Sequence, residues 1–193
     1  MNDVSLGLAH EAEVMLRKFG ATRENFWIPI SKDEELAWQV IEFVSGKSFY
    51  SVFVDYGMSV EKAVKRGKYD WVNNKITQKN FPTGRTGKAD VEIRLFHFNR
   101  SILSEDAIKG INRAGYRPVE IHEFLALGGK YPDLQRKFSI IAPGSVCVWQ
   151  HPNGECYVPC LSGDGSKREL DLNCLEHYWN DNCRFAAVRK SKK

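Results

Sequence analysis

Cysteine and histidine side chains carry most of the chemistry that this sequence offers. The five cysteines all lie in the last 47 residues, at Cys147, Cys156, Cys160, Cys174 and Cys183. An odd number of thiols without a secretion signal argues against a complete disulfide framework, so we expect buried thiols. A zinc site and a single disulfide stay open as alternatives. The Cys156-x-x-x-Cys160 spacing, however, differs from the common two-residue zinc knuckle.

Nucleophilic catalysis is a second use for a thiol that has a histidine nearby. His151 and His177 are the candidate bases, and His177 follows Cys174 by three residues. A reactive cysteine needs a lowered pKa, which a nearby cation or helix N-terminus supplies. The sequence contains no His-Glu-x-x-His, phosphate-loop or dinucleotide-binding pattern. We therefore assign no catalytic residue, metal ligand or cofactor, and keep a cysteine-dependent oxidative or hydrolytic enzyme as an alternative.

The segment 150–183 combines aromatic side chains with asparagine, aspartate and histidine. Aromatic rings supply rigid contact area, while amide, carboxylate and imidazole groups supply adaptable hydrogen bonds. This combination favours recognition of a protein or a small polar ligand. The candidate ligand-binding residues are Gln150, His151, Asn153, Tyr157, Asn173, His177, Tyr178, Trp179, Asn180 and Asp181.

Composition and charge argue against several other classes of protein. Of the 193 residues, 42% are hydrophobic and 27% are charged, which is typical of a globular chain. The net charge of +4 comes from residues 189–193, because basic and acidic residues balance elsewhere, so we do not expect a nucleic-acid partner. The first residues lack a basic region followed by an apolar one, and no apolar run is long enough for a membrane span. We therefore expect a cytoplasmic protein that does not contact a membrane.

Residues 1–87 are predicted to form an N-terminal, helix-rich α+β module. Helical spacing and capping residues predict its helices, and β-branched and aromatic residues predict its strand. These helices span 8–19, 31–44 and 59–67, and the strand spans 48–55. Residues 73–90 have few apolar positions and predict a long exposed loop, which is the best candidate for a domain boundary.

Residues 88–190 are predicted to form a second domain, and residues 191–193 a basic tail. Alternating apolar and polar residues over 91–98 predict its first strand. Two helices are predicted over 104–114 and 119–127. Short strands are predicted over 138–142, 145–149, 155–160, 169–173 and 183–189.

The order of elements over about residues 91–190 resembles the C-type-lectin-like fold. The resemblance rests on the helix 104–114 with the turn Gly115-Tyr116-Arg117-Pro118, on Trp179-Asn180-Asp181 near Cys183, and on the closing strand 184–189. His151-Pro152-Asn153 is similar to the sugar-reading segment of true lectins. Formylglycine-generating enzymes and retroelement-diversified receptor proteins share this fold.

The resemblance implies a domain of two helices and short antiparallel strands, in which the closing strand pairs with the first strand. It also implies that the C-terminal loops face the ligand. We therefore expect a non-catalytic module that binds a protein or a small polar ligand. Besides the cysteine enzyme, a small effector or inhibitor of a mobile element that binds a macromolecule is an alternative.

Overall fold

The computed structural model describes residues 17, 22, 49–147 and 154–190. The chain divides into two compact units, Met1–Ser48 and Phe49–Lys193. The division therefore falls between residues 48 and 49, whereas the sequence placed a boundary near residue 87. In the predicted helix over 8–19, the structure describes only Arg17, which is helical. The predicted helix over 31–44 lies outside the described residues.

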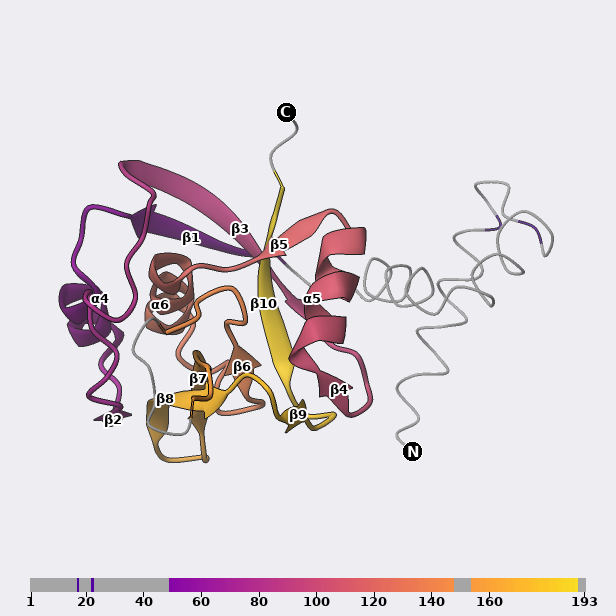
Figure 1. The fold of residues 1–193 in the computed structure, drawn as a ribbon. Helices are drawn as coiled ribbons and strands as arrows, with labels where there is room; N and C mark the ends of the chain where they lie inside the picture. Colours follow the sequence, from indigo (N-terminus) through magenta and orange to yellow (C-terminus); the bar gives the residue numbers. More distant parts are fainter. Residues whose placement is uncertain (1–16, 18–21, 23–48, 148–153, 191–193) are drawn as a thin grey trace. The chain divides into compact units, whose positions relative to one another are not determined.

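Ten strands and three helices make up the described part of the second unit (Figure 1). The strands are β1 (Tyr50–Asp55), β2 (Trp71–Val72), β3 (Lys88–Phe96), β4 (Ile102–Leu103), β5 (Tyr116–Pro118), β6 (Ile140–Ile141), β7 (Tyr157–Gly163), β8 (Arg168–Cys174), β9 (Tyr178–Trp179) and β10 (Arg184–Arg189). The helices are α4 (Val60–Gly67), α5 (Ser104–Arg113) and α6 (Ile121–Lys130). None of the helices that the structure describes is long and apolar enough to cross a membrane.

Eight of these strands form one mixed sheet. Its order is β1-β3-β10-β6-β7-β8-β2, and β5 pairs with β10 beside this path. The strands β4 and β9 form a separate two-stranded sheet. The expected pairing of the closing strand with the first strand is confirmed, because β10 lies antiparallel to β3 with Phe185 opposite Phe96.

This sheet-dominated architecture shows that the predicted fold class is wrong. We expected a helix-rich α+β module followed by a C-type-lectin-like domain of two helices and short antiparallel strands. Instead, β1 pairs with β3 and β2 pairs with β8, so strands on both sides of the expected boundary share one sheet. Periodicity along a chain identifies a strand, but the partner of a strand depends on contacts between distant residues.

The central strand β10 contributes to two hydrophobic cores. Phe185 and Ala187 belong to one core, while Ala186 and Val188 belong to the other. Successive side chains of a strand point to opposite faces, so the two cores lie on opposite faces of β10. Buried residues of α5 join the core of Phe185, and buried residues of β1, α4 and α6 join the core of Ala186.

The segment 73–90, predicted to be an exposed loop, is anchored to this unit at several points. Ile76 and Phe81 are only 4% and 2% exposed, and both belong to the core that includes Ala186. Asn73 donates from Nδ2 to Asp171 Oδ1 of β8 at 2.9 Å. The segment therefore packs against the sheet. Its low apolar content in the sequence gave no indication that Ile76 and Phe81 would be buried.

Arg168, the first residue of β8, connects this strand to the ends of two helices. It is buried, and it donates to the carbonyl oxygens of Gly67 in α4 at 2.8 Å and Gly128 in α6 at 2.7 Å. The last carbonyl groups of a helix lack partners within the helix and carry partial negative charge, so a guanidinium suits them. Its guanidinium carbon also lies 4.8 Å from the centre of the Tyr69 ring. This arrangement holds the start of β8 in place. The thiol, imidazole and carboxylate groups described below lie at the other end of this strand.

Candidate functional site

The antiparallel strands β7 and β8 form a hairpin, and its open end gathers thiol, imidazole and carboxylate groups. In the hairpin register Tyr157, the first residue of β7, lies opposite the last residue of β8. Beyond the paired strands, the N–H of Leu175 donates to the carbonyl oxygen of the residue before β7 at 2.8 Å. The residues gathered here, called the hairpin cluster below, are Glu155, Cys156, Cys174, Glu176 and His177.

Three members of the hairpin cluster lie close enough to share one metal ion. Single ligand atoms of Glu155, Cys174 and His177 all lie within 4.8 Å of one another. His177 Nε2 lies 3.8 Å from Glu155 Oε1. Glu176 accepts from Cys174 Sγ at 3.1 Å and from the backbone N–H of Cys156 at 3.2 Å. Within the described part of the chain, this is the one group of three such side chains placed to hold an ion.

The environment of the thiols does not favour a nucleophilic cysteine. Burial raises the pKa of Cys160 to about 12. Burial and the Glu176 carboxylate together raise the pKa values of Cys156 and Cys174, and burial raises that of Cys183. A nucleophilic thiol needs the opposite shift. These four cysteines are free thiols, so the single disulfide considered from the sequence is not formed among them.

The two residues of β9 lie in opposite environments. Trp179 is 6% exposed, and its Nε1–H donates to Ser104 Oγ at 2.6 Å. Its ring meets the Phe185 ring edge-on, with the ring centres 6.1 Å apart. We assigned Trp179 to ligand binding, but it lies in the core, because Ser104 satisfies the indole N–H there. Tyr178 is instead 71% exposed.

Asn180 and Asp181 shape the turn between β9 and β10. Asn180 Oδ1 accepts from the N–H of Asn182 at 3.0 Å and from the thiol of Cys183 at 3.4 Å. The carbonyl oxygen of Asp181 accepts from His97 Nε2 at 2.7 Å. Both residues are exposed, so their side chains stay accessible, while these contacts give the Trp-Asn-Asp motif a structural role.

The remaining predicted binding residues divide between described and undescribed parts of the chain. Asn173 is exposed on β8, and Tyr157 is partly buried and donates from its hydroxyl to Glu155 Oε2 at 3.0 Å. Together with His177 they lie at the open end of the hairpin. Outside the described residues lie Gln150, His151 and Asn153.

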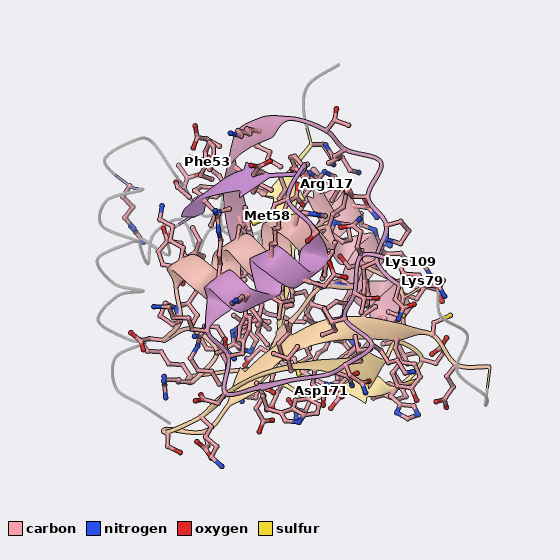
Figure 2. The ribbon with its side chains drawn as sticks, turned by 90° about the vertical axis from the view of Figure 1, so that its left-hand side faces the viewer. Phe53, Met58, Lys79, Lys109, Arg117 and Asp171 are labelled. Carbon is pink, nitrogen blue, oxygen red and sulfur yellow. The ribbon has the colours of Figure 1, made fainter. Side chains whose placement is uncertain are left out.

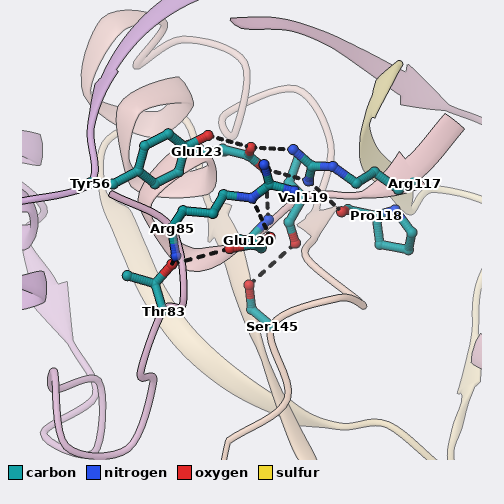
Figure 3. A network of polar contacts seen from close by, with 9 residues as sticks. All are labelled: Tyr56, Thr83, Arg85, Arg117, Pro118, Val119, Glu120, Glu123 and Ser145. Carbon is teal, nitrogen blue, oxygen red and sulfur yellow. Dashed lines mark hydrogen bonds and ion pairs between the residues drawn. The ribbon is translucent and has the colours of Figure 1, made fainter. Parts of the chain in front are cut away.

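A buried polar network at the start of α6 was not foreseen from the sequence (Figure 3). The Glu123 side chain is fully buried and accepts two hydrogen bonds from Arg117, at 2.6 and 2.9 Å. It also accepts from the Tyr56 hydroxyl at 2.7 Å and from the backbone N–H of Glu120 at 2.8 Å. Burial alone would raise the pKa of Glu123, but these hydrogen bonds lower it overall.

The same network explains how the loop before β3 is held. Arg85 donates from Nε to Glu120 Oε1 at 2.6 Å, and Thr83 donates to the other oxygen of that carboxylate at 3.2 Å. One part of this network could have been predicted from the sequence. Glu120 and Glu123 have the spacing of a capping box, and they form one at the start of α6. The contact with Tyr56 joins residues 67 positions apart, so no local pattern indicates it. We interpret the network as structural.

Comparisons with known proteins do not assign this chain to a group. No family model matches it, and no curated protein and no solved structure is significantly similar to it. These comparisons therefore neither support nor refute a relation to C-type-lectin-like proteins. Any functional assignment has to rest on the geometry of the described residues.

Proposed function

We propose that residues 49–190 form a non-catalytic binding module that recognises a protein or a small polar ligand beside β9. The recognition surface, called the β9 surface below, comprises Asn173, His177, Tyr178, Asn180 and Asp181. The observation that carries the proposal is the contrast within β9, where Tyr178 is 71% exposed and the adjacent Trp179 is 6% exposed. The exposed ring of Tyr178 thus belongs to a residue whose chain neighbour, Trp179, is buried in the core.

Such an arrangement suits recognition for a physical reason. Association costs free energy when flexible side chains and loops become ordered, and an anchored strand is already ordered. A tyrosine adds large contact area with only two rotatable side-chain bonds and a hydroxyl for hydrogen bonding. Of the large hydrophobic residues exposed in the described part of the chain, Tyr178 has the largest exposed fraction.

We also propose a cytoplasmic location. Cys156, Cys160, Cys174 and Cys183 are free thiols, and reducing compartments keep thiols in this form. The raised pKa values of these thiols offer no support to the alternative of a cysteine-dependent enzyme. An effector of a mobile element would be a special case of the binding module, since it too would act by contacting a macromolecule.

Site-specific photo-cross-linking tests the proposed surface. A photoreactive phenylalanine analogue placed at position 178 should give a discrete cross-linked product in a lysate of the producing cells. The same analogue at position 53 is the matched control, because Phe53 is 60% exposed. Phe53, which Figure 2 labels, lies on β1 in the eight-stranded sheet, whereas Tyr178 lies on β9 in the separate two-stranded sheet.

The partner identified in the cross-linked product should co-purify with Phe53→Ala but not with Tyr178→Ala. Neither of these variants carries the photoreactive group. For a small polar ligand, native mass spectrometry of the purified protein should show a bound species that Tyr178→Ala alone lacks. Equal capture from positions 178 and 53, or capture that survives Tyr178→Ala, would contradict the proposal.

A further inference from the structure

We propose that Glu155, Cys174 and His177 bind a zinc ion at the open end of the β7–β8 hairpin. The site shares His177 with the β9 surface, and Tyr178 directly follows this residue in the chain. The proposal does not depend on the proposed function, because a zinc ion here would bind whether or not a partner contacts the β9 surface.

The chemistry of the three donors selects the class of metal. One thiol sulfur, one imidazole nitrogen and one carboxylate oxygen match the ligands that zinc takes in proteins. Calcium and magnesium are bound by shells of oxygen atoms, so a sulfur and a nitrogen donor disfavour them. Three protein ligands with an open fourth position are also a common arrangement for zinc.

The distances between the donors are close to those of a tetrahedral site. Zinc–ligand bonds of about 2.0–2.3 Å place neighbouring ligand atoms about 3.3–3.8 Å apart. His177 Nε2 and Glu155 Oε1 are already 3.8 Å apart, and all three donor atoms lie within 4.8 Å. The His177 side chain is 72% exposed and lies on the turn after β8, so a small rotation can close the remaining gap.

The surroundings of Cys174 also suit a cation. Its Sγ donates to Glu176 Oε2 at 3.1 Å. When zinc binds a thiol, the thiol proton is released to the solvent and the sulfur becomes an anion. The thiolate would then lie beside a second anionic group, and a bound dication would hold the two together. The hydrogen bond from the backbone N–H of Cys156 fixes the Glu176 carboxylate in this position.

Metal titration of the purified full chain tests this site. The protein is reduced, treated with a chelator and titrated with Zn²⁺, and with Co²⁺ as a coloured substitute. We expect one equivalent to bind, a Co²⁺ spectrum with a thiolate charge-transfer band, and a higher Tm with excess Zn²⁺. Cys174→Ser and His177→Ala should each weaken zinc binding at least about tenfold. Loss of a residue that only supports a metal ligand already costs about this much affinity, and these two residues are ligands themselves.

Cys183→Ser is the matched control, because Cys183 is a buried thiol outside the hairpin cluster, and it should bind zinc like the unchanged protein. His177→Ala changes an exposed turn residue, so it separates loss of a ligand from loss of the fold even where Cys174→Ser unfolds. Absence of binding, or binding that both ligand variants retain, would overturn the proposal. Glu155 and His177 would then be neighbouring surface side chains only.

Discussion

At the scale of single residues, burial decides which charged pairs matter to this fold. Arg117 and Glu123 form an ion pair of 2.6 Å, with side chains 23% and 0% exposed. Lys109 and Glu105 form a pair of the same length on the surface of α5, with side chains 53% and 76% exposed. Removing one partner of a buried pair leaves an uncompensated charge in the core, whereas water replaces the partner of an exposed charge.

We predict that Arg117→Met lowers the free energy of unfolding by about 3–5 kcal/mol at neutral pH, the usual cost of breaking a buried pair. Lys109→Met is the matched control and should leave the stability almost unchanged. Figure 2 labels both residues. Urea unfolding followed by circular dichroism measures the two effects. A similar loss in both variants would show that burial does not distinguish the pairs.

The Glu123 network also predicts how stability depends on pH. Its hydrogen bonds lower the pKa of Glu123 in the folded protein, so the unfolded chain takes up this proton first as the pH falls. The contribution of Glu123 is therefore complete above its ordinary pKa of 4.5 and is lost as the pH falls through the lower folded value. We expect Glu123→Gln to show a flatter loss of stability than the unchanged protein below about pH 4.5. Parallel pH profiles from thermal unfolding would contradict this expectation.

At the scale of elements, two adjacent glycines in α6 have different roles. Sequence patterns predict that this helix ends at Gly128-Gly129, yet it continues to Lys130. A Cβ atom at Gly128 would collide with the Tyr69 hydroxyl and lie 2.9 Å from Leu161 Cδ1. At the exposed Gly129, the nearest atom would be Gly67 Cα at 3.7 Å, an ordinary contact. Gly128 therefore permits close packing, whereas Gly129 only weakens the helix.

We predict that Gly128→Ala lowers the free energy of unfolding by about 1–3 kcal/mol, because the added methyl group overpacks a filled core. Gly129→Ala should instead raise it by up to about 1 kcal/mol, because alanine favours the helical backbone. The pair forms its own control, since the same methyl group is added at neighbouring positions. Thermal unfolding that shifts in the same direction for both variants would exclude this explanation.

At the scale of the whole molecule, strand pairing decides where the folded unit begins. The strand β1 covers one edge of β3 along Tyr50–Asp55, and β10 covers the other edge. Val52 and Val54 of β1, together with Val60 of α4, lie in the core that includes Ala186. A unit beginning near residue 88 would lose these residues and expose an edge of β3.

We predict that residues 49–193 expressed alone unfold in one cooperative transition, because they form one compact unit. Residues 88–193, the part expected from composition to be a domain with its tail, should aggregate or lack a cooperative transition. Thermal unfolding monitored by near-ultraviolet circular dichroism compares the two fragments. A cooperative transition in the shorter fragment would restore the boundary near residue 87.

The sequence by itself determined most local elements of the described unit. The Ser59 side chain accepts from the N–H of Lys62 at the start of α4, as its capping pattern indicated, and helices occur within or close to 104–114 and 119–127. Alternation correctly predicted a strand over 91–98, which the structure has at Lys88–Phe96. These features depend on neighbours within a few residues, so the local pattern contains the information that forms them.

Only the tertiary structure decided which elements meet and which side chains stay exposed. The sequence indicated Cys174 and His177 as a possible catalytic pair because they are three residues apart. Glu155 joins them in a possible metal site only through the register of β7 and β8. Trp179 looks like a binding residue until Ser104, 75 positions earlier, is seen to accept its indole N–H. Contacts of this kind join distant parts of the chain, and their free energy comes from burial that exists only once the sheet and its cores have formed.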